Sequence, residues 1–427
     1  MILLNNIIYY IEKVIWSAPL TAILMVTHIY YTLILKFPQK HLFKGFKLMF
    51  KNDNVRGVSS FKSLMTILAG TLGVGNIVGV ATAITIGGIG SVFWIFVSGI
   101  FAIATKYAET YIPLKYRVIK NNKYVGGAMY VLKERLGFNI LAFLFSVFVI
   151  FSSFGGAMIQ SNAMTEIIKG EVNISSTVIA ILVTIFACYI IFGSEKKIAI
   201  VSSVIVPIAI LIYVYMCIYL SVCFKDNLVN SIILIIKDAF NFKSSCGGFL
   251  ASAGISAMNT GMSKGLYSNE AGMGSSPLFN VSVNSKKTIK EESIIASTSV
   301  FIDTVLLCTT TGILVVASGV NLSDPIEVIT EVFSVVPYGR HLIFIAITIF
   351  AMSTLPCTGY NGSVGVNYIH RNNKTYEVLY KIIYAMCIYI GCLSTVKIVW
   401  SISSIFNACM IFPNLILIYK LRKEIKA

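Results

Sequence analysis

Eleven stretches of this chain are apolar enough and long enough to cross a membrane as helices. A helix needs roughly 17–25 predominantly apolar residues to span the hydrocarbon layer. Hydrophobic residues make up 56% of the chain and charged residues only 12%, which exceeds what the core of a soluble protein requires. The candidate spans are residues 6–35, 62–84, 87–111, 137–168, 174–193, 198–223, 246–283, 291–318, 340–366, 376–395 and 398–419. The sequence therefore predicts an all-α integral membrane protein with about eleven transmembrane helices.

Lysine and arginine are distributed unevenly between the two sides that these spans define. Of the 34 basic residues, 26 fall on one side, seven on the other, and Lys264 lies within the seventh span. Basic residues gather on the cytoplasmic side of membrane proteins. We therefore expect a multi-pass protein of the cell (cytoplasmic) membrane, with its N-terminus outside and its C-terminus in the cytoplasm. The net charge of +16 therefore indicates the cytoplasmic side. It does not indicate nucleic-acid binding, because the apolar stretches leave no soluble basic face.

The polar segment after the first span, residues 36–56, spaces its lysines so that they share one face of a helix. Lys40, Lys44, Lys47 and Lys51 alternate with phenylalanine and leucine. This pattern predicts an amphipathic helix at the anionic inner leaflet. A plain polar loop is the alternative.

Glycines interrupt the second span. Gly70, Gly73, Gly75 and Gly79 surround Asn76, and each glycine costs roughly 1 kcal/mol relative to alanine inside a helix. An unwound segment here would turn free amides toward a carboxylate, and free carbonyls toward an ammonium group or a sodium ion. The alternative is a small-residue packing face formed by Gly75 and Gly79.

A second interruption, residues 265–277, places Glu270 among the glycines of the seventh span. Placing a carboxylate within the membrane costs free energy, so a carboxylate at this depth indicates a functional residue. Alternatively, Glu270 pairs with Lys264 near the membrane surface. The helix could unwind around residues 260–261 or around residues 268–269.

The two interruptions lie about 200 residues apart, in corresponding halves of the chain. Irregular backbone at membrane depth survives only where it is buried in protein or lines a wet cavity. Broken spans in matching positions are typical of an inverted-repeat secondary transporter.

Other functional classes find less support. The nine cysteines lie mostly within apolar stretches and the four histidines are scattered, so we expect no disulfide, no metal site built from these residues and no enzyme. A channel would need one pore-lining helix repeated in an oligomer, whereas this chain has two unlike interruptions. A non-transporting solute sensor on a transporter fold remains an alternative.

Six segments make the sequence recognisable. They are GTLGVGNIVG (residues 70–79), ATKYAE (104–109), GGAMY (126–130), SNEAGMGSSP (268–277), FIDT (301–304) and FNACMIFPNL (406–415). Together they resemble the alanine or glycine:cation symporter family, also called the sodium:alanine symporter family, in one colinear order over most of the chain.

The resemblance implies a fold and a function. The fold would be one extra N-terminal helix plus the ten-helix core of the leucine transporter, in the amino acid–polyamine–organocation superfamily. The chain would then divide into an N-terminal transmembrane helix with the cytoplasmic amphipathic segment (residues 1–60), a first five-helix repeat (61–224) and a second, inverted five-helix repeat (225–427). Core helix one would be broken near residues 70–76 and core helix six near residues 260–272. The function would be sodium-coupled import of alanine or glycine by alternating access, with a proton as the alternative coupling ion. No organic cofactor and no obligate protein partner are implied beyond the lipid bilayer.

The resemblance also implies site residues. Those expected to bind the amino acid are Thr71, Gly73, Gly75, Asn76, Gln160, Gly261, Gly265, Asn269 and Cys357. Those expected to bind sodium are Leu72, Gly75, Ser353, Thr354 and, as a second cation partner, Asp303. The alternatives are ordinary packing roles: an interhelical hydrogen bond for Gln160, back-bonding to their own helix for the two hydroxyls, and an anchor of the helix for Asp303.

One departure from the family pattern bears on the substrate. The segment LPCTGYNG (residues 355–362) has Cys357 where the family has an aromatic residue, and Pro356 predicts a kink. Losing an indole removes much apolar surface. A pocket larger or wetter than an alanine site would follow, which favours a different or larger small solute as the alternative substrate.

Overall fold

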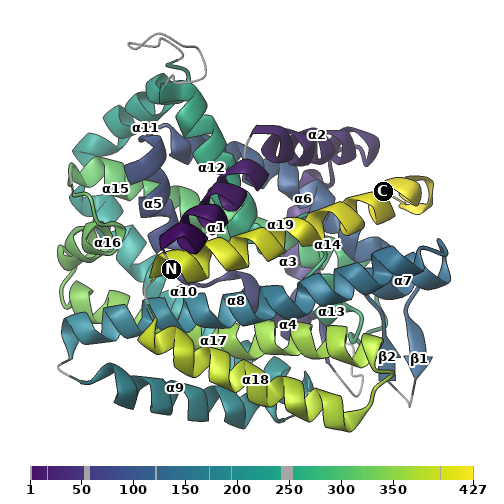
Figure 1. The fold of residues 1–427 in the computed structure, drawn as a ribbon. Helices are drawn as coiled ribbons and strands as arrows, with labels where there is room; N and C mark the ends of the chain where they lie inside the picture. Colours follow the sequence, from purple (N-terminus) through teal and green to yellow (C-terminus); the bar gives the residue numbers. More distant parts are fainter. Residues whose placement is uncertain are drawn as a thin grey trace.

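Helices make up nearly all of the computed structural model (Figure 1). The structure describes residues 2–16, 18–51, 58–120, 123–172, 174–193, 195–241, 253–320, 322–394 and 396–426. The one sheet in these ranges is an antiparallel hairpin of β1 (Val118–Lys120) and β2 (Lys123–Val125), with Val118 opposite Val125. Residues 242–252, which include Cys246 and part of the seventh predicted span, lie outside the described ranges.

The N-terminal part forms four helical segments. They are α1 (Ile2–Ile15), α2 (Ala18–Ile34), the 3-10 turn η1 (Pro38–His41) and α3 (Leu42–Phe50). The chain bends by 64° between α2 and the η1–α3 segment. Residues 42–50 of the lysine-patterned segment are therefore helical. Gly45 and Met49 are buried, with Gly45 against α14, while Phe43 and Phe50 are 84% and 70% exposed.

Two runs of helices follow, one for each predicted repeat. The first contains α4 (Ser60–Thr71), η2 (Val74–Asn76), α5 (Val78–Gly87), α6 (Ser91–Lys115), α7 (Ala128–Glu134), α8 (Asn139–Glu171), α9 (Ser176–Ile191) and α10 (Glu195–Cys223). The second contains α11 (Lys225–Ala239), α12 (Ala253–Asn269), α13 (Pro277–Asn280), α14 (Ile289–Val300), the π-helical segment η4 (Phe301–Cys308), α15 (Thr309–Ser318), α16 (Pro325–Ser334), α17 (Gly339–Ile369), α18 (Lys374–Leu393), α19 (Val396–Lys420) and η5 (Arg422–Glu424).

Polar side chains set where several of these helices begin. The hydroxyl of Ser59 accepts the N–H of Lys62 at the start of α4. At α14, Thr288 and Glu291 form a reciprocal capping box, and Asp324 caps α16 just before its proline. Such side chains satisfy the first amides of a helix, which otherwise lack partners.

The all-α membrane fold is confirmed, whereas the number of spans is not settled by helix length alone. In the described ranges, seven helices are long and apolar enough to cross a membrane, or eight if the bent α2–α3 pair is one span. Every one of the eleven predicted stretches contains helix. Fewer helices than predicted spans meet the length criterion because α4, α5 and α12 are parts of interrupted spans and α9 has only 16 residues.

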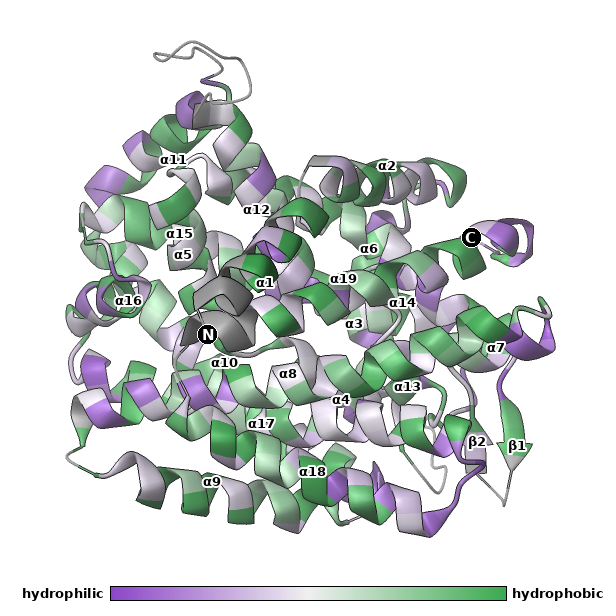
Figure 2. Ribbon diagram, in the orientation of Figure 1, coloured by the Kyte–Doolittle hydropathy of each residue, from purple (hydrophilic) through white to green (hydrophobic). Residues whose placement is uncertain are grey.

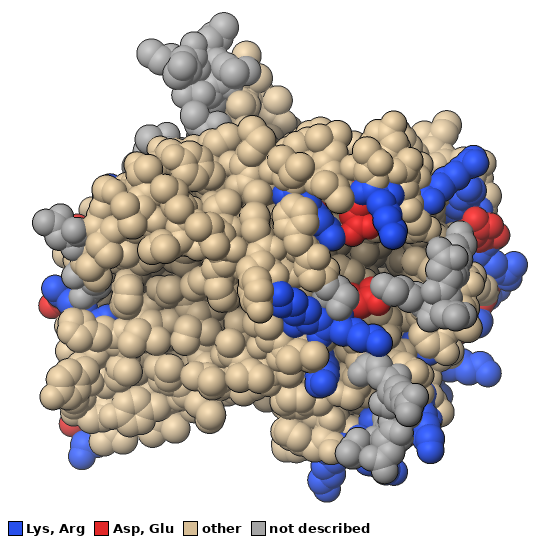
Figure 3. Space-filling view, turned by 90° about the horizontal axis from the view of Figure 1, so that it is seen from below, with Lys and Arg blue, Asp and Glu red and all other residues tan. Residues whose placement is uncertain are grey.

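The surface has the distribution expected in a bilayer. Figure 2 shows apolar residues along the outward faces of α9 and α18, and Leu182, Ile185 and Met386 there are each more than half exposed. Charged residues gather instead at the end of the molecule that holds the β-hairpin and the C-terminus (Figures 1 and 3). Lipid would contact the apolar faces and water the charged ends.

An ion-pair cluster ties the C-terminal segment to this charged end. Glu424 in η5 lies 2.5 Å from the ammonium of Lys115 and 3.2 Å from the guanidinium of Arg135, and it accepts the hydroxyl of Tyr116. The hydrogen bonds from Lys115 and Tyr116 hold the pKa of Glu424 at about 2. The C-terminus is thus anchored to the ends of α6 and α7.

Candidate functional site

The first interruption is a break between α4 and α5. Helix α4 ends at Thr71, and Leu72 and Gly73 are extended before the short turn η2. The side chain of Asn76 accepts the N–H of Gly73 at 2.9 Å, which satisfies an amide that the helix has released. A Cβ at Gly79 would meet nothing within 4 Å, so close packing does not explain that glycine.

The second interruption follows α12. The helix runs unbroken through residues 260–261 and ends at Asn269, whose side-chain oxygen accepts the N–H of Ala271 at 2.9 Å. Glu270 (φ 53°), Gly272 (φ 93°) and Gly274 (φ 74°) adopt left-handed backbone conformations. Glycine adopts such conformations at little cost, whereas they strain a residue such as Glu270. The carboxylate of Glu270 accepts the hydroxyl of Ser275.

The two breaks face one small cavity of about 50 Å³. Six of the predicted site residues line it: Thr71, Gly73, Gly75, Asn76, Gln160 and Thr354. The other lining residues are Gly70, Ser152, Gly156, Ile159, Tyr267, Ser268, Glu270, Thr358 and Asn407. Residues from α4, α8, α12, α17 and α19 therefore meet at one point.

Gln160 lies close against the first break. Its side-chain oxygen accepts the N–H of Val74 at 3.2 Å. A Cβ at Gly73 would fall 2.9 Å from the side-chain carbonyl carbon of Gln160, so only glycine at position 73 permits this approach. The amide of Gln160 can both donate and accept, which suits it to a ligand with a charged amine and a carboxylate.

The predicted sodium ligands on α17 differ in how they point. The hydroxyl of Thr354 donates to the carbonyl of Leu72 at 3.1 Å and to the carbonyl of Phe350 at 2.9 Å. The hydroxyl of Ser353 donates to Phe350 at 2.8 Å. Thr354 and Leu72 thus bring two hard oxygens together at the break, whereas Ser353 bonds within its own helix.

Asp303, which is fully buried, joins the two breaks. Its carboxylate accepts the amide of Asn76 and, at 2.5 Å, the hydroxyl of Ser268. The hydroxyl of Thr71 lies beside the carboxylate, and the second carboxylate oxygen has no other hydrogen-bond partner within the described residues. Asp303 lies in the π-helical segment η4, a local geometry that is frequent at functional sites. A buried set of hard oxygens that includes a carboxylate fits a small alkali cation.

Four of the predicted amino acid ligands do not line this cavity. Gly261 and Gly265 pack against α6, where added Cβ atoms would lie 2.8 Å from Cβ of Trp94 and 3.4 Å from Cα of Ile95. Asn269 caps its own break, as described. Cys357 is buried with its sulfur 3.8 Å from the hydroxyl of Ser202, and α17 is continuous over Pro356.

Several lining residues were not among the predicted ligands. Ser268 and Glu270 lie inside the second interrupted segment, so their position in the sequence could have identified them as site residues. Ser152 precedes Gln160 by eight residues and Thr358 follows Thr354 by four, spacings that place each on the same helix face as its partner. For Asn407, the only signal in the sequence is a polar amide within an apolar span.

Two larger cavities lie on either side of this one along α17. One, of about 360 Å³, is lined near the start of α17 by Arg340 and Ile347 and by residues of α8 and α16. The other, of about 330 Å³, is lined near its end by Tyr360 and Asn367, together with residues around β2 and α18. Thr354 lies between them in sequence. The small cavity therefore sits between two vestibules, one at each end of the helix.

Sequence comparison identifies the family. Residues 1–427 match the model of the sodium:alanine symporter family. The chain belongs to this family. It is 30% identical to the sodium/alanine symporter AgcS of Methanococcus maripaludis, over 95% of this chain and 92% of that protein. It is 35% identical to an uncharacterized transporter of Haemophilus influenzae, over 99% of this chain and 94% of that one.

Structural comparison agrees on the fold. The crystal structure of MhsT in complex with L-phenylalanine matches with a TM-score of 0.58 at 14% identity, over 86% of this chain and 89% of that chain. This likeness shows the leucine-transporter fold that the sequence resemblance implied. The protein is a sodium-coupled amino acid symporter of the membrane, and not an enzyme.

Proposed function

We propose that this symporter imports alanine or glycine together with sodium by alternating access. The observation that supports this most strongly is the shared cavity: both helix breaks and Gln160 line one small space. The cavity is small, about 50 Å³, which favours the smallest amino acids over larger ones. The proposal names a substrate within the broader class that the family membership establishes.

The breaks would bind the two charged ends of the amino acid. Backbone amides at the break between α4 and α5 would face the substrate carboxylate, since amides at a helix start attract anions. Carbonyl oxygens that end α4, and the side-chain oxygen of Gln160, would accept hydrogen bonds from the substrate ammonium group. A zwitterion with a small side chain satisfies both ends at once.

Two groups of oxygens would hold sodium. Leu72 and Thr354 form one, and Ser268 and Asp303 with the hydroxyl of Thr71 form the other. When bound, sodium supplies positive charge beside the substrate carboxylate. Each positive charge that crosses with the membrane potential contributes about 2.3 kcal/mol per 100 mV, which is sufficient to drive concentrative uptake.

The vestibules at the two ends of α17 support alternating access. The inner one lies at the charged end with the β-hairpin and the C-terminus (Figure 3), which the distribution of basic residues assigns to the cytoplasm. Rocking one helix bundle against the other would open the central cavity first to one vestibule and then to the other. Import follows from the inward sodium gradient.

A larger or more polar solute is the second candidate substrate. Ser152, Glu270, Thr358 and Asn407 line both the central cavity and a second cavity of about 20 Å³, which also contains the buried amide of Asn361. These groups offer hydrogen bonds that a methyl side chain does not use. A proton in place of sodium is the alternative coupling ion.

Uptake into proteoliposomes tests the proposal. Radiolabelled alanine and, separately, glycine are supplied with and without an inward sodium gradient to three proteins: the wild type, Gln160→Ala and Asn139→Ala. Asn139 is an exposed amide at the start of the same helix and serves as the matched control. Sodium-dependent accumulation that is strongly reduced only in Gln160→Ala supports the assignment. No uptake of either amino acid by folded wild-type protein contradicts it, and competition by other solutes then identifies the substrate.

A further inference from the structure

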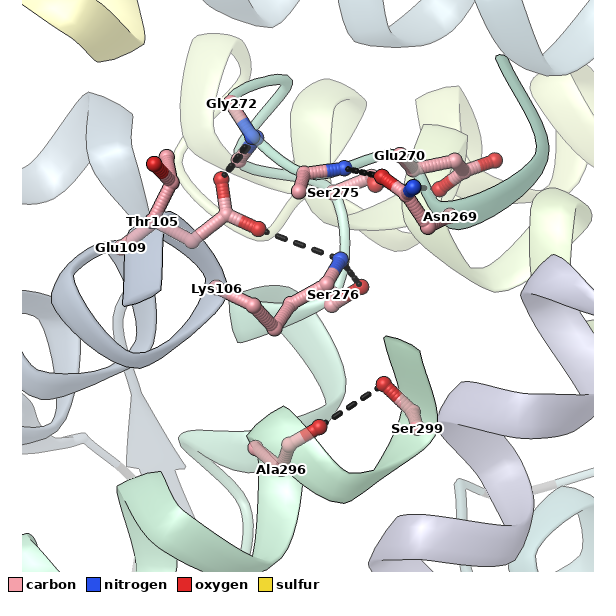
Figure 4. A network of polar contacts seen from close by, with 12 residues as sticks. Thr105, Lys106, Glu109, Asn269, Glu270, Gly272, Ser275, Ser276, Ala296 and Ser299 are labelled. Atoms are coloured by element: carbon pink, nitrogen blue, oxygen red, sulfur yellow. Dashed lines mark hydrogen bonds and ion pairs between the residues drawn. The ribbon is translucent and has the colours of Figure 1, made fainter. Parts of the chain in front are cut away.

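An ion pair on α6 is sealed inside the protein beside the second break. The ammonium of Lys106 lies 3.2 Å from one carboxylate oxygen of Glu109, and both side chains are fully buried. The other carboxylate oxygen accepts the backbone N–H of Gly272 at 2.8 Å (Figure 4) and that of Gly274 at 3.1 Å. A single carboxylate on one helix thus holds two amides of a broken span.

Further contacts fix the same segment along its length. The ammonium of Lys106 donates to the hydroxyl of Ser276 at 2.7 Å (Figure 4). The side-chain amide of Asn414 in α19 donates to Glu109 at 3.0 Å and to the carbonyl of Gly272 at 2.9 Å. Residues 272, 274 and 276 are therefore each tied to the Lys106–Glu109 pair, and a second helix braces the first of them.

This segment determines where two cavity residues lie. It begins at Glu270, which lines the cavity, and the preceding Ser268 both lines the cavity and donates to Asp303. The left-handed conformation at Glu270 strains a non-glycine residue, so the chain keeps it only when its surroundings hold it. A change in how residues 272–276 are held would therefore shift Glu270 and Ser268.

Stability alone does not account for the pair. Replacing a buried ion pair by apolar residues is often neutral or stabilising, whereas removing one partner is strongly destabilising. Ionisable residues within membrane spans are rare for this reason, and they mark functional positions. The pair places an ionised carboxylate oxygen against backbone amides that have no partner within a helix. Such amides form stronger hydrogen bonds to an ionised acceptor than to a neutral one.

We propose that Lys106 and Glu109 are positioning residues of the transport site, which set the second break so that Ser268 and Glu270 present their oxygens to the cavity. Neither side chain lines the cavity, so both act through residues 270–276. The inference rests on the proposed function for its transport readout only. Its structural readout does not depend on which solute is carried.

The experiment compares single and paired charge removal in proteoliposomes. The variants are Glu109→Gln, Lys106→Met, the double variant K106M/E109Q and Asn414→Ala, with the exposed Glu134→Gln as the matched control. Half-saturating concentrations of sodium and of alanine are measured separately from the maximal rate. Hydrogen–deuterium exchange of the peptide over residues 270–276 is measured on the same proteins.

The double variant decides between a positioning role and a structural one. It removes both charges, so it is expected to recover the thermal stability that either single variant loses. Loss of hydrogen bonds to a charged acceptor predicts half-saturating concentrations raised by about tenfold or more, a smaller change in maximal rate, and faster exchange over residues 270–276. Asn414→Ala, which leaves the ion pair intact, should show the same changes more weakly.

Half-saturation and exchange equal to those of the wild type, in the double variant and in Asn414→Ala, would overturn the proposal. If Glu109→Gln does not fold, these two variants carry the test. Absence of alanine or glycine uptake by the wild type contradicts the proposed substrate instead, while exchange over residues 270–276 still reports on the ion pair.

Discussion

Gly73→Ala is the substitution whose effect the geometry specifies most closely. An alanine Cβ would lie 2.9 Å from the side-chain carbonyl carbon of Gln160 and 3.0 Å from its oxygen. The backbone at position 73 (φ −129°, ψ −166°) is extended, and any residue adopts it. The penalty is therefore steric and falls on Gln160, not on the backbone.

The magnitude follows from what Gln160 must give up. If its side chain swings away, it loses the hydrogen bond from the N–H of Val74, which contributes about 0.5–1.5 kcal/mol. If it stays, the crowding costs about 1–3 kcal/mol. In the first case the group that we assign to the substrate ammonium is displaced, and in the second it is held under strain against the break. We expect the half-saturating alanine concentration to rise by about tenfold or more, since 1.4 kcal/mol corresponds to a factor of ten.

The assay is sodium-driven alanine uptake, with Gly79→Ala as the matched control. A Cβ at Gly79 meets nothing within 4 Å, and alanine favours a helix over glycine by roughly 1 kcal/mol, so this variant should transport normally. In the Gln160→Ala background, Gly73→Ala should add no further loss because its clash partner is gone. A normal Gly73→Ala variant, or losses that add in the double variant, would refute the reasoning.

Three further outcomes are expected. Thr354→Val should raise the half-saturating sodium concentration by about tenfold, as expected for a lost ligand of about 1.4 kcal/mol. Ser353→Ala should change it little because that hydroxyl bonds within its own helix. Equal effects of the two variants in sodium titrations of uptake would contradict the assignment. Asp303→Asn should abolish the stimulation of uptake by sodium, and unchanged sodium stimulation in folded protein would exclude the Asp303 cation site. Glu424, whose pKa is lowered from 4.5 to about 2, should stabilise the fold fully above pH 4.5 and progressively less as the pH falls toward 2. Melting temperatures should therefore drop more steeply with acid in the wild type than in Glu424→Gln, and parallel profiles would contradict this.

The membrane class and the place of the site could be predicted because they depend on local patterns. Long apolar stretches specify spans, and glycines clustered around Asn76 and Glu270 weaken a helix beside polar groups that are rare within membrane spans. The cavity indeed lies where these two segments meet. Gln160 could be added only through the family resemblance, because a lone glutamine in an apolar span has several ordinary roles.

Contacts between distant helices could not be predicted from local patterns. Lys106 and Glu109 lie three residues apart on one helix, which is also the spacing of an exposed surface pair. Their burial against Gly272 and Gly274 follows from tertiary packing alone. Likewise, Gly261 and Gly265 have the composition of a break, yet they serve close packing of α12 on α6. Which glycine unwinds a helix and which one packs depends on the neighbouring helix.

The most direct test of the central claim is the influx of labelled sodium into proteoliposomes, measured with and without external alanine or glycine. Coupled symport predicts that either amino acid stimulates sodium influx, in a fixed ratio to its own uptake, and that Asp303→Asn and Thr354→Val reduce this stimulation. Sodium influx that is the same with and without the amino acid, in protein that takes the amino acid up, would contradict sodium-coupled symport at this site.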